Sequence, residues 1–155
     1  MIVYLDASAL VKRYVAEAGS RETNRLIGRA TVVGTALLSR PEVAAALARA
    51  VRVNVLTRAD AAAALQAFRA HWNDLARLQV TETLVAKADA LAWDGGLRGY
   101  DAVHLAAATL WRETLGDRVI LATFDRQLWH AAAGAGLTPW PEALERFTAQ
   151  PARED

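Results

Sequence analysis

The amino-acid sequence predicts a single α/β domain in which helices cover both faces of a central, mainly parallel sheet of four to five short strands. Short apolar runs alternate along the chain with longer segments of helical periodicity. Of the 155 residues, 54% are hydrophobic, and this is enough for one substantial core. Because parallel strands need long crossover connections, which are usually helices, the alternation favours an open sheet in a three-layer fold.

The first half of the chain contributes two strands and four helices. In chain order, a strand, two helices, a strand and two longer helices are expected at residues 2–5, 7–18, 20–28, 31–34, 39–53 and 57–76. The strands are short apolar runs, whereas the helices repeat apolar residues every three or four positions. Gly19 is expected to end the first helix, and Ser20 and Thr57 to cap the helices that follow them.

The second half of the chain contributes three strands and three helices. A strand, two helices, a strand, a helix and an edge strand are expected at residues 78–81, 82–93, 101–114, 118–122, 126–133 and 137–138. Gly95, Gly96 and Gly99 indicate a loop before the second of these helices, and Gly134 ends the last one. Residues 1–149 are expected to form the single domain. Residues 150–155 are polar and are expected to be a frayed C-terminal tail.

Four acidic residues stand where strands end or helices begin. Asp6 and Asp125 each follow a predicted strand, and Glu42 and Asp101 lie in the first turns of predicted helices. In an open parallel sheet, strand ends and the neighbouring helix starts converge on one crevice. Clustered carboxylates repel one another unless a cation joins them, and Mg2+ prefers oxygen ligands while keeping positions for water and phosphate. The sequence therefore predicts a divalent metal site.

Each acid also has a purely local interpretation. Asp6 and Asp125 could cap the helices that follow them. Asp101 places a negative charge near a helix N-terminus, which stabilises a helix by about 0.3 to 1 kcal/mol. Ser39 and Glu42 have the spacing of a capping box, in which the glutamate returns to the backbone N–H of the cap residue. These alternatives remain open at this point.

The stretches around the acids are more specific than the acids alone. They read MIVYLDASALVKRY, SRPEVAAALARA, LRGYDAVHLAAA and VILATFDRQL, in this order. Together they resemble the PIN-domain nucleases, most closely the VapC-type toxins of bacterial toxin–antitoxin pairs, and the resemblance spans nearly the whole chain.

The resemblance implies a PIN-like fold and a metal-dependent endoribonuclease that acts as the toxin of a VapBC-like pair. It implies that Asp6, Glu42, Asp101 and Asp125 are catalytic and bind Mg2+ or Mn2+. RNA would be the substrate, a small VapB-like antitoxin the protein partner, and a homodimer the expected assembly. A housekeeping PIN nuclease in RNA maturation and a catalytically silent PIN binding module are the alternatives within the family.

Several other side chains are candidates for supporting roles. Ser8 and Thr123 match positions where the family keeps a small hydroxyl near the metal, and a hydroxyl can orient a carboxylate. His104 shares a helix face with Asp101, which leaves a packing role or a supporting role open. Among the arginines near the acidic stretches, those considered for contact with RNA phosphates are Arg13, Arg98, Arg126 and Arg118.

Composition excludes several classes of protein. The 18 basic and 17 acidic residues give a formal net charge of +1, so any contact with a polyanion must be local. With no cysteine, disulfides and thiolate chemistry are excluded. The sequence has no signal peptide pattern and no membrane-length apolar stretch, so a cytoplasmic location is expected. A haloacid-dehalogenase-like phosphotransferase would need a second aspartate where this chain has Ser8.

Overall fold

The computed structural model describes residues 1–148, and the strands in this range form one parallel sheet. The strands are β1 Ile2–Leu5, β2 Val32–Ala36, β3 Ala76–Leu78, β4 Val119–Ala122 and β5 Thr138–Trp140. Their order across the sheet is β3-β2-β1-β4-β5. The expected fold class is therefore confirmed. The predicted tail at residues 150–155, and the domain end at residue 149, lie outside the described residues.

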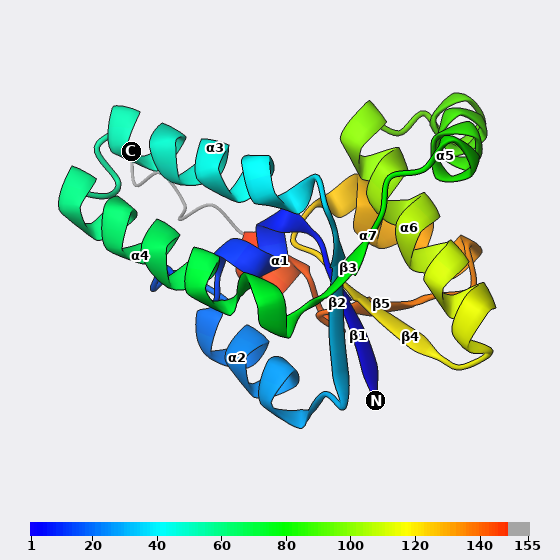
Figure 1. Cartoon of the computed structure of the whole chain (residues 1–155), viewed down its shortest axis with the longest axis horizontal. Coiled ribbons are helices and arrows are strands. Elements are labelled where there is room, and N and C mark those ends of the chain that lie inside the picture. The colour runs from blue at the N-terminus through cyan, green and yellow to red at the C-terminus, as the bar shows by residue number, and fades with distance from the viewer. Residues whose placement is uncertain (149–155) are drawn as a thin grey trace.

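Helices cover both faces of this sheet (Figure 1). In chain order they are α1 Ala7–Val11, α2 Ser20–Arg29, α3 Ser39–Arg52, α4 Arg58–His71, the short 3-10 helix η1 Trp72–Asp74, α5 Glu82–Gly95, α6 Gly99–Leu115, α7 Arg126–Gly134 and α8 Glu145–Thr148. Helices α1 to α4 pack on one face, and α5 to α7 pack on the other. The molecule thus has the three layers that the pattern predicts.

The central strand β1 contributes to both hydrophobic cores. Val3 and Leu5 point into the core beneath α1 to α4, whereas Tyr4 points into the core beneath α5 to α7. All three side chains are fully buried. Side chains alternate along a strand, so a strand covered on both faces must be apolar throughout. This alternation places the Tyr4 hydroxyl on the same side of the sheet as α6.

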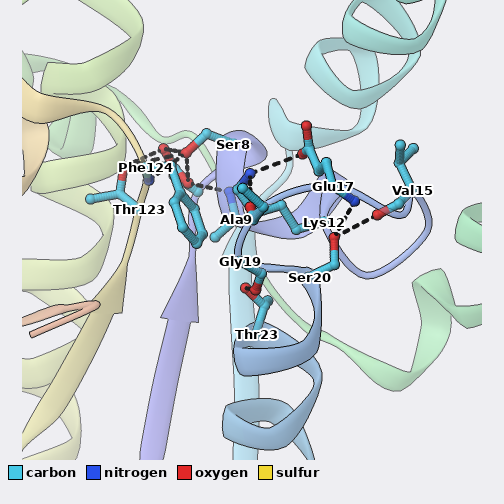
Figure 2. A network of polar contacts seen from close by, with 12 residues as sticks. Ser8, Ala9, Lys12, Val15, Glu17, Gly19, Ser20, Thr23, Thr123 and Phe124 are labelled. Carbon is cyan, nitrogen blue, oxygen red and sulfur yellow. Dashed lines mark hydrogen bonds and ion pairs between the residues drawn. The ribbon is translucent and has the colours of Figure 1, made fainter. Parts of the chain in front are cut away.

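The first helix is shorter than predicted. It ends at Val11, and not near residue 18, because the chain turns at Lys12. The buried Lys12 ammonium donates to the Ala18 carbonyl at 2.7 Å and to the Glu17 carboxylate at 3.0 Å (Figure 2). These two bonds hold the turn after α1 together. They also give the buried ammonium the hydrogen-bond partners that a buried charge needs.

The expected cap of α2 is also wrong. Gly19 is the N-cap residue, with a φ of +90°, a left-handed conformation that favours glycine. Ser20 is the first helical residue, and its hydroxyl serves the preceding turn. It accepts from the Glu17 N–H at 3.0 Å and donates to the Val15 carbonyl at 2.6 Å. Figure 2 shows this turn beside the start of α2.

The largest of the other differences from the prediction are at the end of α4 and the start of β3. The helix predicted to reach residue 76 ends at His71, and η1 leads into β3, which pairs with β2 in the register Gly34↔Ala76. Strand β3 therefore begins at Ala76, two residues earlier than expected, and it ends at Leu78. Trp72 and Leu75 continue the apolar spacing of the helix and are buried although the helix ends before them, so apolar spacing alone could not place its end. The short helix α8 was not predicted.

Candidate active site

The four predicted acids line one cavity of about 800 Å3 above the carboxyl ends of β1 and β4. Asp6 directly follows β1, and Asp125 is the N-cap residue of α7, just beyond β4. Glu42 comes from the first turn of α3 and Asp101 from the first turn of α6. The two central strands and one helix from each layer thus bring residues far apart in the sequence together.

Asp6 is held by three groups. One carboxylate oxygen accepts from the Ala9 N–H at 2.9 Å, so the capping interpretation of Asp6 is confirmed. The other accepts from the Thr123 hydroxyl at 2.7 Å, and the Ser8 hydroxyl lies 2.8 Å from the first and 2.9 Å from the second. Burial raises the pKa of Asp6 above its ordinary value, although these bonds oppose the rise. Asp6 is a buried carboxylate that a nearby cation would stabilise.

The two hydroxyls join the ends of β1 and β4. Besides binding Asp6, the Ser8 hydroxyl accepts from the Phe124 N–H at 2.8 Å (Figure 2). The Thr123 hydroxyl accepts from the Asp125 N–H at 3.0 Å. Each hydroxyl therefore bonds both to the carboxylate and to the backbone that leads to Asp125. This arrangement fixes the orientation of Asp6.

Arg98 bridges two of the acids. Its Nε donates to Asp101 Oδ2 at 2.7 Å, and its Nη2 donates to Asp125 Oδ2 at 2.5 Å. The other oxygen of Asp125 accepts from the Leu128 N–H at 3.0 Å, which confirms Asp125 as the cap of α7. Burial raises the pKa of Asp101, the hydrogen bond from Arg98 lowers it, and the charge of Asp125 raises it further.

Glu42 points toward the opposite helical layer. Its Oε2 lies 2.8 Å from His104 Nε2, and His104 Nδ1 lies 2.8 Å from the Tyr4 hydroxyl. The capping box with Ser39 is not formed. Helix α3 has no side-chain cap, and the Ser39 hydroxyl bonds to Thr35 at 2.6 Å. The capping interpretation of Glu42 is therefore wrong.

Only one of the arginines singled out by sequence, Arg98, lines the cavity in the described structure. The Arg13 guanidinium lies over the Tyr14 ring, 5.8 Å from its centroid. Arg126 borders a separate hollow beside Trp129. Arg118 precedes β4 and donates to Thr138 at 2.7 Å, so it sits at the opposite end of the sheet from Asp125.

Three basic residues that were not singled out do line the cavity: Lys12, Arg49 and Arg52. Lys12 is already paired with Glu17, whereas Arg49 and Arg52 lie exposed on α3. A signal for Arg49 was available, because it follows Glu42 by seven residues and two helical turns bring it to the same face.

The donor chemistry of the cavity fits a hard divalent cation. Within residues 1–148, no three acidic or histidine side chains are close enough, as they stand, to form a metal cluster. Arg98 instead supplies positive charge between Asp101 and Asp125. Four carboxylates nevertheless line one cavity, and burial raises the pKa of Asp6 and of Asp101. A set of carboxylate oxygen donors, two of them in a partly desolvated setting, is what Mg2+ or Mn2+ prefers.

Together, the parallel sheet and the acids at its carboxyl edge define an α/β protein with an acidic crevice, and comparison with known proteins gives its family. The PIN domain family matches residues 3–134, and the chain belongs to this family. Two ribonucleases of Mycobacterium tuberculosis, VapC45 and VapC49, are each 37% identical over 145 residues, covering 93% of this chain and 98% of each relative. The predicted PIN family and VapC type are therefore confirmed, and the phosphotransferase alternative is wrong.

Solved structures share the fold at lower identity. PAE2754 from Pyrobaculum aerophilum superposes with a TM-score of 0.64 at 23% identity, covering 97% of this chain and 91% of the other. A toxin-antitoxin complex from Klebsiella pneumoniae gives a TM-score of 0.57 at 17% identity, covering 79% and 86%. Within residues 1–148 no helix is both long and apolar enough to span a membrane.

Proposed function

We propose that this VapC-type ribonuclease hydrolyses internal phosphodiester bonds of RNA in a metal-dependent reaction. The observation that carries the proposal is the convergence of Asp6, Glu42, Asp101 and Asp125 on one cavity. Sequence relatives also support the proposal, because the ribonucleases VapC45 and VapC49 match almost the whole chain.

The four carboxylates would hold one or two Mg2+ or Mn2+ ions. When bound, such an ion polarises the phosphate, activates water and stabilises the departing oxygen. The protein provides orientation. Ser8 and Thr123 donate to Asp6, and the backbone N–H of Ala9 fixes one of its oxygens. A carboxylate held in this way does not have to be ordered when the ion binds.

RNA would approach along the basic wall of the cavity. The net charge of the chain is only +1, so attraction to a polyanion must come from a local group of cations. Arg49 and Arg52 on α3 and Arg98 before α6 are exposed at the cavity and can contact phosphate oxygens. This assignment replaces Arg13 and Arg126, which do not line the cavity.

In the cell, we propose that the protein is the toxin of a toxin–antitoxin pair. It would act in the cytoplasm as a homodimer. A small VapB-like antitoxin would inhibit it by blocking the acidic cavity. The relationship to the VapC ribonucleases favours this role over housekeeping RNA maturation. The presence of all four acids favours an enzyme over a silent binding module. Growth arrest on expression, relieved by the gene product encoded next to it, would distinguish the toxin from a housekeeping nuclease.

The catalytic proposal is tested by incubating the purified protein with a structured RNA in Mg2+, in Mn2+ and in EDTA. Cleavage should require the metal and should be lost in Asp101→Asn. Asp117→Asn is the matched control, because it removes the same charge at an exposed position before β4. Cleavage that persists in EDTA, or in Asp101→Asn, would refute the proposal.

A further inference from the structure

We infer that His104, together with Tyr4, is a positioning residue that fixes the Glu42 carboxylate at the cavity. The inference deepens the proposed function and rests on it, because it concerns how one proposed metal ligand is oriented. The observation behind it is a continuous hydrogen-bonded chain from the sheet, through α6, to α3.

The chain joins three elements of the fold. Tyr4 on β1 is fully buried and His104 on α6 is 2% exposed, whereas the Glu42 side chain on α3 is 23% exposed and lines the cavity. The Tyr4 and His104 rings also meet edge to face, with centroids 5.9 Å apart. The imidazole is thus held by packing, and both of its nitrogens have a partner.

The direction of the hydrogen bonds follows from what each group can do. A phenol keeps its proton at neutral pH, and the fully buried Tyr4 hydroxyl has His104 Nδ1 as its partner. It can therefore donate to His104 Nδ1. An ionised carboxylate only accepts, so His104 Nε2–H donates to Glu42 Oε2. One carboxylate oxygen is fixed in this way, and the other has no hydrogen bond from His104.

Packing alone does not account for this arrangement. A buried polar side chain costs free energy unless it is hydrogen-bonded, and an apolar residue could fill the core without that requirement. The polar chain ends at a carboxylate on the cavity wall, and not at another buried group. Partners of this kind that hold a ligand in place typically contribute about 10- to 100-fold to metal affinity.

Two substitutions of His104 separate positioning from packing. His104→Gln keeps a donor near the position of Nε2 and loses the partner of Tyr4, whereas His104→Asn keeps a partner near Nδ1 and loses the donor to Glu42. Both remove the ring. In calorimetric titrations with Mn2+ and no RNA, His104→Asn should bind about 10- to 100-fold more weakly than the parent. His104→Gln should bind nearly as well as the parent. Equal weakening in both variants would overturn the inference.

A double-mutant cycle with Glu42→Gln adds a second readout. Once the carboxylate is gone, His104→Asn should cause no further loss of Mn2+ affinity, because the group that His104 positions is already absent. Additive losses would overturn the inference.

Tyr4→Phe keeps the ring and its packing, so it serves as the informative variant if those at His104 fail to fold. It should weaken Mn2+ binding, and an unchanged affinity would overturn the part assigned to Tyr4. If the parent protein binds no Mn2+, the proposed function itself fails. If the parent binds and the variants behave alike, only the positioning inference fails.

Discussion

Arg98 donates through Nε to the Asp101 carboxylate at 2.7 Å, within the first turn of α6. The same guanidinium reaches Asp125, so it places a positive charge between two of the proposed metal ligands. The Arg98 side chain is 67% exposed, and it can therefore leave this position without disturbing the core. If the proposed site binds a metal ion, Arg98 would compete with it for Asp101 and Asp125, and the exposed guanidinium would also be available to a phosphate.

Removing this competitor should strengthen metal binding. Arg98→Ala should bind Mn2+ more tightly than the parent, by up to roughly fivefold, because an exposed ion pair contributes about 0.2 to 1 kcal/mol. The Michaelis constant for RNA should rise in the same variant, because a group that binds phosphate is removed. Titration calorimetry and steady-state cleavage measure the two effects separately, with Arg118→Ala as control. Weaker Mn2+ binding would show that Arg98 does not compete with the metal.

Glu42→Gln should abolish metal-dependent cleavage at little cost in stability. The amide oxygen can still accept from His104 Nε2, so the contact between α3 and α6 is retained, whereas a neutral amide cannot balance a divalent cation. Glu42→Ala should lose cleavage as well, and any loss of stability should come from the missing partner of His104 Nε2, because no capping box exists. Cleavage assays and urea unfolding measure these effects, with Glu82→Gln in the first turn of α5 as control. Full activity in Glu42→Gln would remove Glu42 from the site.

In the metal-free protein, the free energy of unfolding should depend on pH through the ionisation of Asp6. Burial raises the pKa of Asp6 in the folded state, so the folded protein holds this proton to higher pH than the unfolded chain does. The contribution of this proton to the free energy of unfolding is fully present below pH 3.8, the pKa of the unfolded chain. It is lost as the pH rises through the pKa of Asp6 in the folded protein.

Asn does not titrate, so Asp6→Asn should gain free energy of unfolding relative to the parent as the pH rises from acidic to neutral in EDTA. Urea unfolding over this range, with the exposed Asp94→Asn as control, measures the difference. A difference that shrinks with rising pH would contradict the raised pKa.

The basic wall on α3 should act on substrate binding. Changing both Arg49 and Arg52 to Ala should raise the Michaelis constant for RNA, and the slope of binding against salt concentration should fall by about one for each phosphate that is no longer neutralised. The turnover number and the Mn2+ affinity should be unchanged, because neither side chain is a proposed metal ligand. Arg29→Ala on α2 is the matched control. A salt dependence equal to that of the parent would place the RNA elsewhere.

The acids could be found from the sequence because their signals are local. Asp6 and Asp125 follow apolar strands, and Asp101 opens a periodic helix, so the parallel topology brings them to one edge. Ser8 and Thr123 were predicted through the family resemblance, but the carboxylate that each hydroxyl binds, and the partner of His104, could not be found from local spacing. The bonds from Tyr4 to His104 and from Thr123 to Asp6 join residues 100 and 117 positions apart, and no spacing along one element indicates them.

Element boundaries failed where a single side chain decides the outcome. Residues after Val11 have helical periodicity, but the Lys12 ammonium finds its acceptors in the turn at residues 17 and 18. Glu42 has the spacing of a capping box, but it bonds to His104, 62 residues away. In both places a long-range or turn contact overrides the local preference.

The pairing of β1 with β4 also bears on when this protein becomes active during its synthesis. Asp6 is made first, yet its partner hydroxyl on Thr123 and the neighbouring Asp125 come from the last third of the chain. A nascent chain that stops short of β4 has no strand to complete this part of the carboxyl edge, and it lacks the Thr123 hydroxyl that helps to orient Asp6. Most of the polypeptide must therefore be synthesised before the four acids can converge on one cavity.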